Sequence, residues 1–165
     1  MRPFARTWTL ELQPRRIRVN VLSPWTMAGL RTTAIVCFAI EVLWLLERTD
    51  RADVLEANLR EKTLKPDFRY VQVDARLSLA RLCALTGRER EARDWFAAAR
   101  RVLDEQGALP LRAVVDLDEA RMERRLGEAG DHARAEALLC SARERFAALG
   151  VSGWLRRAHE LAARS

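Results

Sequence analysis

The chain has 165 residues, 49% of them apolar, which is enough for one globular domain with a buried core and excludes a disordered tail. The net charge is +6 and the sequence pI about 10.2, values that taken alone suggest nucleic-acid binding. However, residues 1–31 hold six of the 29 basic residues and one of the 23 acidic residues, so the rest carries only +1. A nearly neutral body with mixed-sign charges argues against a nucleic-acid partner.

The three cysteines, Cys37, Cys83 and Cys140, are far apart and lie among apolar residues, so no disulfide framework is predicted. The most apolar run, residues 34–46, is interrupted by Glu41 and is shorter than the roughly 20 residues that span a bilayer. The start of the chain lacks the pattern of a signal peptide. We therefore expect a cytoplasmic protein without a membrane partner.

Helical patterns follow one another along most of the chain. The first predicted helix covers residues 33–47 and the second covers residues 51–63, with a polar turn between them. Two more pairs follow, with apolar residues three and four positions apart. In one pair, a helix over residues 76–86 is followed by a second helix that begins at residue 90. In the other, a helix over residues 111–126 is followed by a second helix that continues through residue 146. Residues 151–163 form a last helix that would cover the final pair.

Glycines punctuate these helices at regular intervals. Gly87, Gly107, Gly130 and Gly150 each follow a helical pattern, and they are 20, 23 and 20 residues apart. A shift of 43 residues superposes the first two glycines on the last two, together with several alanines between them. The sequence therefore predicts an internal repeat of helical hairpins.

One hairpin resembles the tetratricopeptide repeat. Its small and large residues follow the order of that family, with Leu79 and Ala80 before the turn at Gly87 and with Ala92 and Phe96 after it. The resemblance implies an all-α, tetratricopeptide-like solenoid of about three hairpins plus a capping helix. It also implies that the first helix of each pair lines a concave face. We expect a short helix–strand appendage before this solenoid.

A wider resemblance covers about residues 33–164. The segments DWFAAARRVLDEQGALPLRAVVDLDEAR and FAALGVSGWLRRAHEL look like the C-terminal helical region of large bacterial multidomain ATPase and transcriptional regulators. In those proteins the nucleotide site lies in other domains, so the resemblance implies no catalytic or cofactor-binding residues here. We expect residues 31–165 to form one helical repeat domain.

The beginning of the chain resembles another family. The segments FARTWTLEL and RRIRVNVLSP, within residues 2–24, are similar to a helix and strand of short-chain dehydrogenases. Residues 1–30 are therefore expected to be a fragment of that fold rather than a domain. The only tyrosine, Tyr70, is followed four residues later by Asp74 in place of that family's lysine, and no glycine-rich phosphate loop occurs. The expected consequence is that dehydrogenase activity is absent.

Other patterns offer little chemistry. His132 and His159 lie apart from each other, and no pair of cysteines has the spacing of zinc ligands, so no metal site is predicted. Four acidic residues with helical spacing could suggest paired catalytic carboxylates. They are Asp116, Asp118, Glu119 and Glu123. We interpret the cluster instead as ion-pairing residues, because Asp116 and Glu119 are spaced for an exposed helix face beside Arg112, Arg121 and Arg125.

The sequence thus predicts a non-catalytic protein-interaction module, without cofactor or metal, that binds a protein or peptide. The tetratricopeptide resemblance would place Asp74, Arg81, Arg121 and Arg124 near the concave groove as partner-binding residues. Solvated surface positions are the alternative for these four. For Trp44, Trp95 and Trp154, helical spacing favours core packing over a role as partner anchors. An inactive, truncated short-chain dehydrogenase relative and a nonfunctional fragment remain alternative interpretations. The oligomeric state and the partner stay open.

Overall fold

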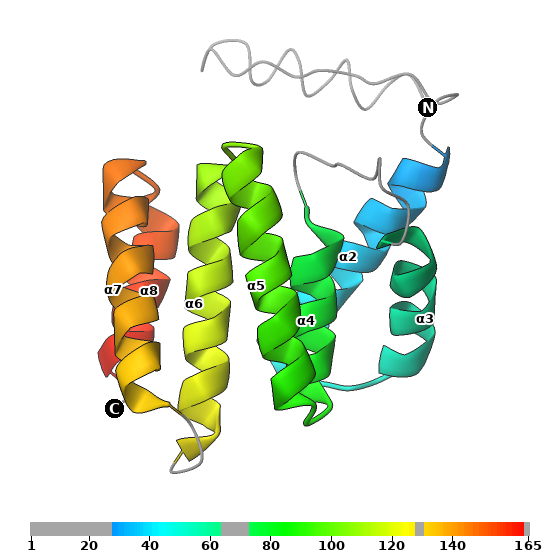
Figure 1. Ribbon diagram of the computed structural model, residues 1–165, viewed down its shortest axis with the longest axis horizontal. Coiled ribbons are helices and arrows are strands. Elements are labelled where there is room, and N and C mark those ends of the chain that lie inside the picture. Colours follow the sequence, from blue (N-terminus) through cyan, green and yellow to red (C-terminus); the bar gives the residue numbers. More distant parts are fainter. Residues whose placement is uncertain (1–27, 64–72, 128–130, 164–165) are drawn as a thin grey trace. The chain divides into compact units, whose positions relative to one another are not determined.

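The computed structural model describes residues 28–63, 73–127 and 131–163, and among these the side chains of residues 33–61, 73–127 and 131–163. These residues are all-helical and include no strand (Figure 1). They form the helices α2 (Ala28–Leu46), α3 (Ala52–Thr63), α4 (Ala75–Leu85), α5 (Glu89–Glu105), α6 (Leu109–Arg125), α7 (His132–Ala148) and α8 (Ser152–Ala163). The predicted helix–strand appendage and the dehydrogenase-like segment lie outside the described residues, apart from the start of α2. The chain divides into the units Met1–Thr32 and Thr33–Ser165, and the second is described below.

From α3 onward, helices that follow one another in the sequence are neighbours in space. The closest pairs are α4 with α5 and α6 with α7, and α5 packs on α6 and α7 on α8. Figure 1 shows α4, α5, α6 and α7 side by side in this order. In addition, α4 contacts α6 directly, so the first helices of successive pairs are adjacent. This order follows from short turns, because they leave each helix no partner nearer than the next one in the chain.

Glycines end four of the helices, as predicted for Gly87, Gly107 and Gly150. The φ angle of Gly87 is +72°, a left-handed conformation that costs other residues free energy and that closes a helix. The third stop is Gly127, with φ +57°, whereas the predicted Gly130 lies outside the described residues. Gly127 follows Gly87 by 40 residues and Gly150 follows Gly107 by 43. The repeated hairpins therefore differ in the length of their inner turn.

Small and large residues alternate along the buried faces of α5 and α7, as the sequence predicted. On α5, Phe96 lies between Ala92 and Ala99, and all three are 0% exposed. On α7, Phe146 follows Ala142 by one turn, and both are 0% exposed. The alanines allow neighbouring helices to approach closely while the rings fill the space between them.

The three tryptophans differ in burial. Trp44 of α2 is 0% exposed and belongs to the main core, which confirms the core interpretation for this residue. Trp95 and Trp154 are only partly buried and pack against that core. Trp154 stacks on Phe146, with ring centroids 5.9 Å apart, and so attaches α8 to α7. Part of its surface is thus left for other contacts.

Candidate functional site

The acidic residues of α6 are buried, so the prediction of an exposed helix face is wrong. Asp116, Asp118, Glu119 and Glu123 are between 0% and 5% exposed. The physical reason is the position of α6, which packs on α4, α5 and α7 at once and has little surface left for water. A buried carboxylate must be paired, because removing its hydration costs several kcal/mol or more.

Arginines of the neighbouring helices pair with two of these carboxylates, Asp116 and Glu119. Arg100 of α5 donates from Nε to Asp116 over 2.8 Å and also pairs with Glu119. Arg134 of α7 donates to Glu119 over 2.6 Å. Ser141 of α7 adds a hydrogen bond to Asp116 of 3.0 Å. These contacts connect α5, α6 and α7 through one buried polar network.

Glu123 forms a two-pronged ion pair with Arg93 of α5. Both nitrogen–oxygen distances are 2.7 Å, and the backbone N–H of Asp131 lies 3.4 Å from the same carboxylate. The hydrogen bonds from Arg93 lower the pKa of Glu123 below its ordinary value. Glu123 is therefore held as an anion, and it is a poor candidate for a general acid.

The predicted ion pairing of the acidic residues is correct, but most partners were missed. Of the predicted partners, Arg112 alone pairs with the cluster, through Asp116 at 2.5 Å. Arg121 pairs instead with Glu47, in the turn just after α2, at 2.9 Å. The partners found in the structure lie on α5 and α7, and a single sequence carries no signal for which arginines face α6.

Asp118 joins three helices near the interior of the fold. Its carboxylate accepts a hydrogen bond of 2.7 Å from Arg81 of α4 and one of 2.8 Å from the Trp44 indole of α2. Asp118, Arg81 and Trp44 are 5%, 5% and 0% exposed. We call these three residues the Asp118 junction. It fixes α2, α4 and α6 relative to one another.

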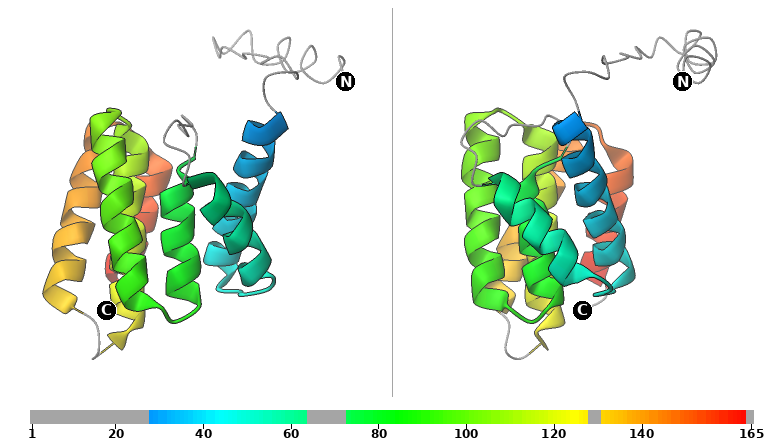
Figure 2. Two further views of the ribbon diagram at one scale, coloured as in Figure 1. Left: turned by 45° about the vertical axis from the view of Figure 1, so that its right-hand side comes forward. Right: turned by 90° about the vertical axis from the view of Figure 1, so that its right-hand side faces the viewer.

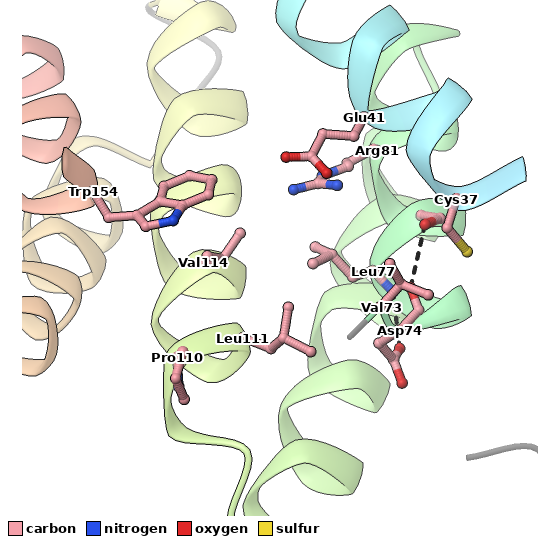
Figure 3. A pocket seen from close by; sticks show the side chains of 11 residues that line it. Cys37, Glu41, Val73, Asp74, Leu77, Arg81, Pro110, Leu111, Val114 and Trp154 are labelled. Atoms are coloured by element: carbon pink, nitrogen blue, oxygen red, sulfur yellow. Dashed lines mark hydrogen bonds between the residues drawn. The ribbon is translucent and has the colours of Figure 1, made fainter. Parts of the chain in front are cut away.

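Two cavities lie next to this junction. Cavity 1 has a volume of about 220 Å³, and α2, α4, α6, α8 and the residues just before α4 line it. Its lining residues are Cys37, Glu41, Val73, Asp74, Leu77, Ser78, Arg81, Pro110, Leu111, Val114 and Trp154. Figure 3 shows Trp154 across cavity 1 from Leu77, with Glu41 and Arg81 extending toward the same end.

Cavity 2 has a volume of about 210 Å³ and is lined by α2, α6 and α8. Its lining residues are Leu45, Leu117, Asp118, Arg121, Trp154, Arg157, Glu160 and Leu161. Trp154 borders both cavities, so they adjoin, and we refer to the two together as the groove. No residue of α3, α5 or α7 lines either part.

Three of the four predicted partner-binding residues line this groove. Asp74 and Arg81 border cavity 1, and Arg121 borders cavity 2. Asp74 also caps α4 by accepting hydrogen bonds from two backbone N–H groups, and with 8% exposure it offers little surface. Arg124 lies outside both cavities, where it donates to the backbone carbonyl of Leu161 over 2.6 Å.

The sequence did not single out Leu111 or Arg157, and it assigned Trp154 to packing. Arg157 is exposed, and its guanidinium lies over the Trp154 ring at 4.8 Å. It forms no ion pair with any other residue in the described part of the chain. Only their positions on α6 and α8 identify these residues as groove-lining, and those positions have no meaning before the groove is known.

A second cluster brings Glu56, Cys83 and Glu91 together, with potential ligand atoms within 4.8 Å of one another. Arg88 donates to Glu56 over 2.9 Å and lowers its pKa, and Arg60 pairs with both carboxylates. Burial raises the pKa of the Cys83 thiol to about 12, so the sulfur stays protonated. The cluster is thus a set of arginine–carboxylate pairs around a neutral thiol, and its chemistry does not suit a cation.

No family model, curated protein or solved structure matches this chain. Within the described residues, no helix is long and apolar enough to cross a membrane.

Proposed function

We propose that this chain is a non-catalytic, tetratricopeptide-like module that holds a segment of another protein in the groove formed by cavities 1 and 2. The observation that carries this proposal is the lining of the groove. Every lining residue belongs to the first helices of successive pairs, to α8 or to the residues just before α4. The resemblance of residues 33–164 to bacterial multidomain regulators supports a role in signalling or transcriptional regulation.

The chemistry of the groove suits binding better than catalysis. The Asp118 carboxylate is already committed to Arg81 and Trp44, and the other buried acids of α6 are paired with arginines. A general base needs a lone pair that can reach a substrate, and these carboxylates use theirs within the fold. The same contacts hold the helices rigid, which lowers the entropy lost when a partner binds.

The groove fits a peptide with an apolar side chain followed by an acidic one. Cavity 1 offers Leu77, Leu111, Val114 and Trp154 to an apolar group of moderate size. Cavity 2 adds the exposed Arg157, which lacks an acidic partner in the described part of the chain. An acidic side chain there would form an ion pair at the rim, where charge contributes mainly to specificity.

A matched pair of arginines on α8 tests this proposal. Arg157 lines cavity 2, whereas its neighbour Arg156 is exposed and lies outside both cavities. Peptides selected from a random display library against the full chain should bind Arg157→Glu at least about fivefold more weakly, a typical loss for a rim charge. Their affinity for Arg156→Glu should remain within about twofold of wild type.

Leu111→Asp, which places a charge at cavity 1, should abolish binding altogether. Circular dichroism verifies the helical content of each variant. Selected peptides that bind wild type, Arg157→Glu and Leu111→Asp equally would refute the groove as the site, and so would a selection without binders. Arg81→Glu is unsuitable, because it would place a second carboxylate against buried Asp118 and disturb the fold.

The truncated-dehydrogenase alternative rests on residues 2–24, which lie outside the part of the chain that the structure describes. A nicotinamide-cofactor titration separates the two ideas, since tight binding would favour the dehydrogenase. A nonfunctional fragment would bind neither a selected peptide nor a cofactor.

A further inference from the structure

Helix α2 is apolar on more sides than its own domain covers. Its 19 residues include only Arg31 and Glu41 as charged side chains. Cys37, Ile40 and Trp44 face the core and are at most 2% exposed. A helix that is apolar all round is normally buried on all sides. The right-hand view of Figure 2 shows α2 and α3 facing the viewer, with no other helix of the described part over them.

The opposite face of α2 carries a row of large apolar side chains that we call the α2 stripe. Its members are Ile35, Phe38, Val42, Leu45 and Leu46, and they are 66%, 48%, 52%, 43% and 61% exposed. These fractions correspond to about 500 Å² of contiguous apolar surface, the upper range for a soluble monomer. No charged side chain belongs to this row. The stripe adjoins the groove at Leu45, which also borders cavity 2, but the exposure of its other members does not depend on the groove.

The spacing of the stripe is that of a helix that packs on another helix. Ile35, Phe38, Val42 and Leu45 are three, four and three residues apart, which matches positions a, d, a and d of two heptads. The a positions hold β-branched residues and one d position holds leucine, a combination that favours two parallel strands. The pattern therefore favours the α2 helix of a second copy as the partner that packs on the stripe.

Charge favours a parallel over an antiparallel pair. Glu41 occupies the g position beside the stripe. In an antiparallel pair of α2 helices with Ile35 opposite Leu45, the two Glu41 side chains would flank the same central point. In a parallel pair the neighbour of Glu41 is Leu46 of the other copy, at position e. The parallel pair avoids the like-charge contact.

We propose that two copies of this chain associate through their α2 stripes, with the two α2 helices parallel. The pair buries about 1,000 Å² in total, the lower end of what specific interfaces bury. The association is accordingly weak, with a dissociation constant of about 10 µM or higher. The two heptads provide the register, and the rest of the domain keeps each α2 folded before it meets its partner.

Sedimentation of the full chain from about 1 µM to 500 µM, a range that brackets the expected constant, tests the association. We expect a reversible monomer–dimer equilibrium in wild type. Val42→Lys should abolish the dimer. The control is Leu109→Lys, which replaces an apolar residue of similar exposure, 47%, that lies outside the α2 stripe, and should leave the equilibrium unchanged. A monomer at all concentrations, or a dimer unaffected by Val42→Lys, would overturn the proposal.

A cysteine at position 45 tests the orientation. In a Cys140→Ser background, which leaves only the buried native cysteines, oxidation of Leu45→Cys should link two copies rapidly in a parallel dimer. In an antiparallel dimer aligned about the centre of the stripe, the two positions would lie roughly 15 Å apart, too far for a disulfide. A dimer that forms without this link would overturn the parallel arrangement.

Discussion

The ion pair of Arg93 and Glu123 permits a test of how the buried carboxylates of α6 contribute to stability. The Glu123 side chain is 0% exposed and that of Arg93 is 36% exposed. Glu123→Gln leaves the Arg93 guanidinium without its anion, but water can still reach this group. Arg93→Met leaves a buried carboxylate whose nearest remaining cation is Arg134, 4.0 Å away. We therefore predict that Arg93→Met is the more destabilising substitution.

The structure supplies rough magnitudes for both changes. Glu123→Gln exchanges two charge-assisted hydrogen bonds of 2.7 Å for neutral ones, and such losses range over about 1.5–3 kcal/mol. Because Arg93 regains hydration, we expect a cost of about 1.5 kcal/mol. Removing one partner of a buried pair costs about 3–5 kcal/mol, and the nearby Arg134 places Arg93→Met at about 3 kcal/mol.

The pH dependence has a defined sign. Arg93 lowers the pKa of folded Glu123 below the ordinary value of 4.5, so the stability from this pair is fully present above that value. It is lost as pH falls through the lower, folded pKa. The cost of Glu123→Gln should therefore be largest near neutral pH and disappear in acid. In Arg93→Met the carboxylate is buried without its partner, which raises its pKa, so this cost should also shrink as pH falls.

Urea unfolding followed by circular dichroism at neutral pH and in acid measures these costs. Arg90→Met is the control, because Arg90 is an exposed arginine on the same helix, and its effect should stay within about 0.5 kcal/mol. Equal costs for the two test variants, or a larger cost for Glu123→Gln, would refute the argument from unequal burial.

Two further predictions concern buried polar groups. Trp44→Phe keeps an aromatic ring but removes the indole donor to Asp118, and should destabilise the fold by about 1–3 kcal/mol in urea unfolding. Trp95→Phe, which loses only a partly exposed contact of 3.4 Å, should cost less; the reverse order would contradict the role of the Asp118 junction. Iodoacetamide at pH 8 should modify exposed Cys140 in the native protein and spare Cys83, whose pKa is raised to about 12. Rapid modification of Cys83, detected by peptide mass spectrometry, would contradict its burial.

Local signals in the sequence predicted much of the helical framework. Gly87, Gly107 and Gly150 end helices because left-handed closure of a helix is favourable for glycine, a preference that needs no knowledge of the fold. The buried faces of α5 and α7 follow from apolar spacing for the same reason. The tetratricopeptide-like and regulator-like resemblances stay predictions.

The interior of α6 could not be predicted in this way. Its acidic residues alternate with apolar ones, a pattern that normally indicates one exposed face, because charged side chains are seldom fully buried. The exception depends on Arg93 and Arg100 of α5 and on Arg134 of α7, which are distant in sequence and reach α6 only in the folded chain. Whether a charged side chain of α6 is buried therefore depends on how the helices pack, which the pattern within α6 does not reveal.

The buried pairs of α6 have a consequence for the groove. Replacing such pairs with apolar residues is often neutral or stabilising, so their presence is weak evidence for stability. They differ from apolar contacts in directionality: a carboxylate that accepts from Arg81 and Trp44 tolerates only small displacements of either helix. A shift of α6 along α4 would leave Asp118 unpaired, whereas apolar side chains could repack. Asp118, one of the residues that look catalytic in the sequence, therefore holds the lining helices α2, α4 and α6 in register, which is what a preformed binding surface requires.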